Sequence, residues 1–139
     1  MLTKTLVTLA CFAAFDLLNV PTVSAQTLYF EVVVDGEQAG TGSPGTGSVN
    51  VLFNSVTRDI SIAGTFAGLD GQVTLAHLHV DTQAIPIVML THSEDTDDFS
   101  GSSNIEKEFV NTILNGGSYI NLHSTAVPGG EIRGYLLNP

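Results

Sequence analysis

The sequence has 139 residues, and its acidic side chains far outnumber its basic ones. Fourteen Asp and Glu residues stand against four Lys and Arg, which gives a formal net charge of −10 at pH 7. A surface of this charge repels phosphate backbones and anionic lipid, so we exclude nucleic acid and anionic membranes as partners. The length suits a single domain around one hydrophobic core.

The first 25 residues have the pattern of a signal peptide. Lys4 precedes an apolar run over 6–15, which is too short to cross a bilayer because a spanning helix takes about 20 residues. Ser24 and Ala25 then supply the small residues that a signal peptidase recognises. We therefore predict a signal peptide over 1–25 and one β-domain over 26–139. The mature protein would be secreted, extracellular or periplasmic, with no transmembrane anchor.

Removal of this segment would also remove Cys11, the single cysteine of the sequence. The mature domain could then form no intrachain disulfide, although export usually permits them. Its stability would have to come from the core. The remaining thirteen acidic and three basic residues keep it strongly acidic.

Strand patterns dominate the rest of the chain. They combine β-branched and aromatic residues with alternation of apolar and polar positions, and glycine, proline or asparagine separates them. In chain order, the expected strands cover 27–34, 48–53, 59–66, 74–80, 87–90, 118–123 and 131–136. The pair Asp35-Gly36 indicates a turn, and the glycine-rich stretch 40–47 indicates a loop.

Two later segments break this pattern. The stretch 93–103 contains four acids and many hydroxyls, and we expect an exposed loop there. Ile105, Phe109 and Ile113 are spaced by four, which predicts one short helix near 105–115 with Asn104 as its N-cap. Strands separated by turns, with a single helix, predict an all-β fold: an antiparallel, Greek-key-like sandwich or barrel.

Three histidines share one face of two expected strands. Alternate residues of a strand point to the same side, so His77 and His79 lie opposite the apolar Ala76, Leu78 and Val80. His123 likewise lies opposite Ile120 and Leu122. We therefore place the three imidazoles on the outer surface of the sheet. If the two strands are neighbours, the imidazoles can converge on a zinc or copper ion.

Other residues give weaker signals. His92 follows a short strand and is the weakest candidate ligand; a lone histidine at a strand end is more often simply solvated. Glu131 and Arg133 share a face and could pair with each other or with a neighbouring strand, as a structural contact. Ser124 follows His123 directly, so the two side chains point to opposite faces and do not form a nucleophile–base pair. We identify no catalytic residues.

The segments AHLH (76–79), GSYINLHS (117–124) and PGGEIRG (128–134) together resemble the CHRD (chordin) domain, and the resemblance covers essentially the whole of 26–139. It implies an extracellular β-sandwich module with an extracellular protein or matrix component as partner. The remaining motif residues would be structural determinants: Tyr119, Asn121, Gly130, Glu131, Arg133 and Gly134. The H-x-H strand is also similar to the copper-ligand strand of Cu/Zn superoxide dismutases.

Three functions follow as hypotheses. The first is a binding module that holds copper or zinc through His77, His79 and His123, with binding that weakens as the pH falls through about 6.5. The second is a structural or adhesive extracellular module without a metal. The third, which we favour least, is a dismutase-like copper enzyme, because the negative charge would repel superoxide and no second set of zinc ligands is evident. We favour a binding protein over an enzyme.

Overall fold

The computed structural model describes residues 27–81, 83–93 and 95–137. The predicted signal peptide over 1–25 lies outside the described residues, so it stays a prediction. No helix in the described part of the chain is long and apolar enough to cross a membrane.

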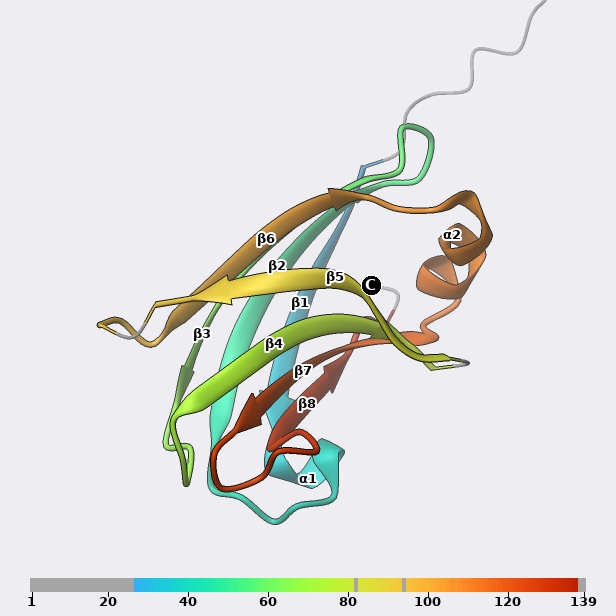
Figure 1. The fold of residues 1–139 in the computed structure, drawn as a ribbon. Helices are drawn as coiled ribbons and strands as arrows, with labels where there is room; N and C mark the ends of the chain where they lie inside the picture. Colours follow the sequence, from blue (N-terminus) through green and yellow to red (C-terminus); the bar gives the residue numbers. More distant parts are fainter. Residues whose placement is uncertain (1–26, 82, 94, 138–139) are drawn as a thin grey trace, which may run out of the picture.

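Eight antiparallel strands close into a barrel (Figure 1). They are β1 (Thr27–Asp35), β2 (Thr46–Asn54), β3 (Asp59–Ala67), β4 (Val73–Val80), β5 (Gln83–His92), β6 (Asp98–Asn104), β7 (Ser118–Ser124) and β8 (Ile132–Tyr135). Around the barrel their order is β1-β2-β3-β6-β5-β4-β7-β8. The connections from β3 to β4 and from β6 to β7 each pass over two strands, so the predicted all-β, Greek-key-like architecture is confirmed, in its barrel form.

The barrel interior holds the apolar half of each alternating strand. In β2, for example, Val49, Val51 and Phe53 are fully buried while the residues between them are exposed. The same alternation in β4 and β7 sends Leu78, Ile120 and Leu122 into the core. Every strand contributes apolar side chains to this core. Their burial is the source of stability in a chain whose single cysteine can form no intrachain disulfide.

One expected loop proved to be a strand. Residues 98–104 form β6, which pairs with β3 along its whole length and with the end of β5. The prediction of a loop over 93–103 was wrong for these residues. Only one side chain of β6, that of Phe99, reaches the core, so the sequence shows no alternation of apolar and polar residues there. Asp98, three serines, a glycine and Asn104 occupy the other positions, and backbone pairing with β3 holds them in a strand.

The helices also differ in detail from the expectation. The predicted helix is present as α2 (Lys107–Leu114), but Glu106 occupies its N-cap position. Asn104 instead ends β6, where its amide donates to the Thr57 carbonyl and the Asp59 carboxylate. A second, single-turn helix, α1 (Gly36–Ala39), replaces the expected turn, because the Asp35 carboxylate caps it by accepting from the Gln38 N–H.

Candidate metal centre

Strands β4 and β7 are hydrogen-bonded neighbours, as convergence of the histidines requires. In their register His77 lies opposite Asn121, His79 opposite Tyr119, and His123 opposite Leu75. Directly opposed residues of an antiparallel pair point to the same side of the sheet. The next strand, β8, extends these two lines of opposed residues across the sheet, since Arg133 lies opposite Asn121 and Tyr135 lies opposite Tyr119. Figure 1 shows β4, β7 and β8 side by side.

The three imidazoles form one compact group, which we call the histidine cluster: His77, His79 and His123. One potential ligand atom from each lies within 4.8 Å of the others. The ring centroid of His77 is 5.4 Å from that of His79 and 5.1 Å from that of His123, and both contacts are edge-on. Strand geometry therefore brings together the three residues that the sequence singled out.

The cluster is on the outer side of the barrel wall, but it is not the exposed surface that we expected. His77 is 5% exposed and His79 6% exposed, and His123 is partly buried. Part of the cover over His79 is Tyr119, whose ring is stacked parallel to the imidazole at a centroid distance of 5.1 Å. Arg133 lies over the same phenol ring, with its guanidinium carbon 4.3 Å from the centroid. The Tyr119 ring on β7, with the Arg133 guanidinium of β8 lying over it, thus helps to shield His79 from water.

The buried histidines lack hydrogen-bond partners. Within the described residues, both ring nitrogens of His77 and both of His79 are buried without a donor or acceptor. A buried polar atom without a partner costs about 1–3 kcal/mol. A neutral imidazole carries one N–H and one lone pair, so each ring is free to offer a lone pair to a ligand.

His123 is oriented by the turn between β7 and β8. Its Nδ1 lies 2.7 Å from the carbonyl oxygen of Pro128. Because a carbonyl only accepts, this contact assigns the proton to Nδ1 and leaves the lone pair on Nε2. Nε2 is 3.4 Å from the amide nitrogen of Asn121. A backbone carbonyl that holds the distal N–H of an imidazole is the usual support for a histidine metal ligand.

The surroundings also keep two of the imidazoles neutral. Burial, and then the neighbouring imidazoles and the guanidinium of Arg133, lower the pKa of His79 to about 4. Burial, and then the charge of His123, lower the pKa of His77. A neutral imidazole is the form that binds a metal ion. At these two residues, protons therefore compete with a metal ion only at a pH below the value of about 6.5 that the sequence led us to expect.

The Glu131–Arg133 pair allowed by the sequence does not form. Glu131 is fully buried, and its Oε1 accepts from the Ser43 hydroxyl and the Asp70 N–H. Burial acts to raise its pKa, but hydrogen bonds, first from Ser124 and Ser43, outweigh this and lower the pKa overall. Arg133 lies on Tyr119 instead. Glu131 precedes β8 and joins two loops to it, a role that strand alternation alone could not reveal.

The two motif glycines allow close approach. A Cβ on Gly130 would collide with the amide group of Asn121, and the φ angle of Gly130 is 114°. A Cβ on Gly134 would collide with the backbone carbonyl of Val33 on β1. Gly130 therefore lets the β7–β8 turn pack against Asn121, the residue opposite His77. Gly134 lets β8 approach β1 closely enough to close the barrel.

His92 does not join the histidine cluster. It is the last residue of β5 and lies on the same side of the strand as the buried Leu90. Met89 and Thr91, which alternate with them, point outward, to the side of the barrel wall where the histidine cluster lies. It contributes instead to a cavity of about 680 Å³ that is also lined by Asp70, Asp95 and Asp97. The structure thus separates the weakest of the four candidate ligands from the other three.

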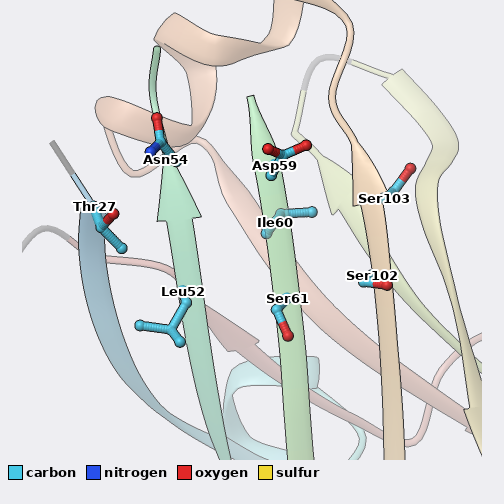
Figure 2. A pocket seen from close by; sticks show the side chains of 8 residues that line it. All are labelled: Thr27, Leu52, Asn54, Asp59, Ile60, Ser61, Ser102 and Ser103. Carbon is cyan, nitrogen blue, oxygen red and sulfur yellow. The ribbon is translucent and has the colours of Figure 1, made fainter. Parts of the chain in front are cut away.

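A second hollow of about 440 Å³ lies across β1, β2, β3 and β6 (Figure 2). Its lining residues include Leu52, Ser61 and Ser102, which are exposed. Figure 2 shows these side chains on separate strands, together with the Asn54 amide and the Asp59 carboxylate near one end of the hollow. The one carboxylate in this lining, Asp59, accepts a hydrogen bond from the Asn104 amide, and we assign no catalytic role to the hollow.

Comparison with known proteins gives one match. The family model described as CHRD domain matches residues 30–136. No curated protein and no solved structure matches the chain.

Proposed function

Because the chain belongs to the CHRD domain family, whose members are generally extracellular, we propose that it is an extracellular binding module that holds a transition metal ion. The ligands would be His77, His79 and His123, and the ion copper or zinc. The observation that carries the proposal is the set of four buried ring nitrogens without partners in His77 and His79.

The donor set fits such an ion. Three imidazole nitrogens, with a fourth coordination position left to another ligand, suit zinc and copper. Two nitrogens bound to one zinc ion at about 2.0–2.1 Å lie about 3.4 Å apart in tetrahedral geometry. The ligand atoms of the histidine cluster lie within 4.8 Å of one another, so side-chain rotations that move each atom by about 1 Å would suffice. The Pro128 carbonyl supports His123 as a ligand through Nε2.

Titration calorimetry of the purified protein with Cu²⁺ and with Zn²⁺ tests this proposal. We expect one ion to bind per chain, and the double variant His77→Ala/His79→Ala to lose this binding. His92→Ala is the matched control, because it removes an imidazole outside the cluster and should bind as the parent does. Equal affinity in the double variant and the parent would show that the cluster is not the site.

A structural or adhesive module without a metal is the second candidate. The observation in its favour is the number of large apolar side chains exposed on the barrel wall, among them Val33, Leu52 and Ile85. Exposed apolar groups suit contact with an extracellular protein or matrix component. In that case the aromatic packing around His79 serves the fold alone, and metal ions leave stability unchanged.

A further inference from the structure

Met89 lies beside the histidine cluster. In the pairing of β4 with β5, Met89 is directly opposite His77, and opposed residues of an antiparallel pair point to the same side. Their Cβ atoms are therefore expected about 4.5–5.5 Å apart. Met89 is also the only sulfur-containing residue in the described part of the chain, since Cys11 and Met1 precede it.

The exposure of Met89 contrasts with that of its neighbours. Its side chain is 61% exposed, next to a histidine that is 5% exposed. An exposed methionine has three rotatable bonds and a polarisable thioether, so its sulfur can swing over the cluster at little cost. Leu90 and Val88, on either side, point into the core and hold the backbone of Met89 in place.

A thioether discriminates between metal ions. It is a soft ligand that selects copper(I), whereas zinc in proteins takes cysteine thiolate, imidazole or carboxylate. Among the described residues that oppose His77, His79 and His123 across β4, β5 and β7, none is acidic or a cysteine. Asn121 and Tyr119 oppose two of the histidines, but they offer an amide oxygen and a hydroxyl, and oxygen ligands suit harder ions than copper(I). Among these opposing residues, Met89 therefore offers the one soft ligand.

We propose that Met89 supplies its thioether as a fourth ligand and that the ion held is copper, in the +1 state. This inference rests on the proposed function, since it needs the three histidines to bind the same ion. It narrows the choice between copper and zinc and gives the exposed methionine a role.

Competition for copper(I) with bicinchoninate, under a reductant and without oxygen, tests the inference. Met89→Leu keeps the size and apolar character of the side chain and removes the sulfur. We expect it to weaken copper(I) binding by roughly ten- to a hundred-fold, a range seen even for outer-shell partners of metal ligands, and to leave zinc binding unchanged. Ile85→Leu is the matched control, an equally exposed position on the same strand.

The outcomes separate the two claims. If His77→Ala/His79→Ala loses copper but Met89→Leu binds copper(I) as tightly as the parent, the inference is wrong and the proposed function stands. If the parent binds neither copper nor zinc, both fail. Selenomethionine labelling gives a direct signature: selenium-edge X-ray absorption should detect copper bound to selenium in the loaded parent and not in Met89→Leu. A parent spectrum without a copper neighbour would also overturn the inference.

Discussion

His79 shows how one side chain on a barrel wall can become a buried, neutral base. Strand alternation directs it away from the core, yet Tyr119 stacks on its ring and leaves it 6% exposed. The pKa of His79 is lowered to about 4, so the imidazole keeps its lone pair at neutral and mildly acidic pH. The same packing that excludes water thus keeps a ligand atom available.

This residue predicts a pH dependence of stability. His79 has its ordinary pKa of about 6.5 when the chain is unfolded and a pKa of about 4 when folded. Between these values the unfolded state binds more protons, so stability rises with pH. In protein prepared without metal, the contribution of His79 to the free energy of unfolding should be fully present above pH 6.5. It should decrease by on the order of 3 kcal/mol as the pH falls to 4.

Urea unfolding at a series of pH values measures this loss. The variant His79→Gln cannot titrate at this position and should show a correspondingly weaker decline between pH 6.5 and 4. Identical slopes in the parent and the variant would mean that His79 is exposed enough to protonate in the folded protein.

At this scale the sequence predicted which histidines meet but not how they are enclosed. The period of two in the strands is a property of the local sequence, and it identified His77, His79 and His123. The cover over His79 comes from Tyr119 and Arg133 on two later strands. Glu131 similarly bonds to residues far away in the chain, and no local period indicates such a contact.

Among the elements, the turn between β7 and β8 connects the fold to the site. Its Pro128 carbonyl holds the proton of His123, and its Gly130 lies against Asn121. The Glu131 N–H that follows donates to the Leu122 carbonyl on β7. This segment belongs to the PGGEIRG motif, so the structure gives the motif a physical role in positioning one wall of the histidine cluster.

Two adjacent glycines of this turn make a matched test. Gly130→Ala would place a methyl group against the Asn121 amide at a φ of 114°, and such strained backbone costs about 1–3 kcal/mol before the collision is counted. Gly129→Ala meets open space and should change stability by less than about 0.5 kcal/mol. Denaturant unfolding of both variants measures the difference. Equal effects of the two substitutions would contradict the close packing described for this turn.

The sequence predicted those strands that have several inward-facing apolar residues, and it missed the strand that has only one. Strands with several inward apolar residues, such as β2 and β4, have a clear period of two. β6 sends only Phe99 inward and forms because β3 offers a continuous pairing edge, which depends on the tertiary fold. Asn104 was expected to cap the helix, but its amide binds β3 and the preceding turn instead.

For the whole molecule, a closed barrel with a site on its wall ties metal binding to folding. The cluster draws on β4 and β7, and its support comes from the following turn and β8, so unfolding of the barrel would separate the ligands. An ion that binds only the folded state adds about 2.7 kcal/mol of stability at a free concentration of 100 times its Kd.

We therefore expect copper to raise the melting temperature of the parent by roughly 10 °C, and a chelator to reverse the rise. The double variant His77→Ala/His79→Ala should show no such change, which separates binding at the cluster from nonspecific binding to the acidic surface. A melting temperature that copper and chelator leave unchanged in the parent would favour the structural or adhesive module.

The most direct test of the account is anomalous X-ray diffraction from crystals of the protein loaded with copper, collected on both sides of the copper absorption edge. We predict one strong anomalous peak among the rings of His77, His79 and His123, at about 2 Å from a nitrogen of each. Anomalous peaks confined to other places, such as the acidic cavity beside His92, would contradict the claim that the histidine cluster is the metal centre.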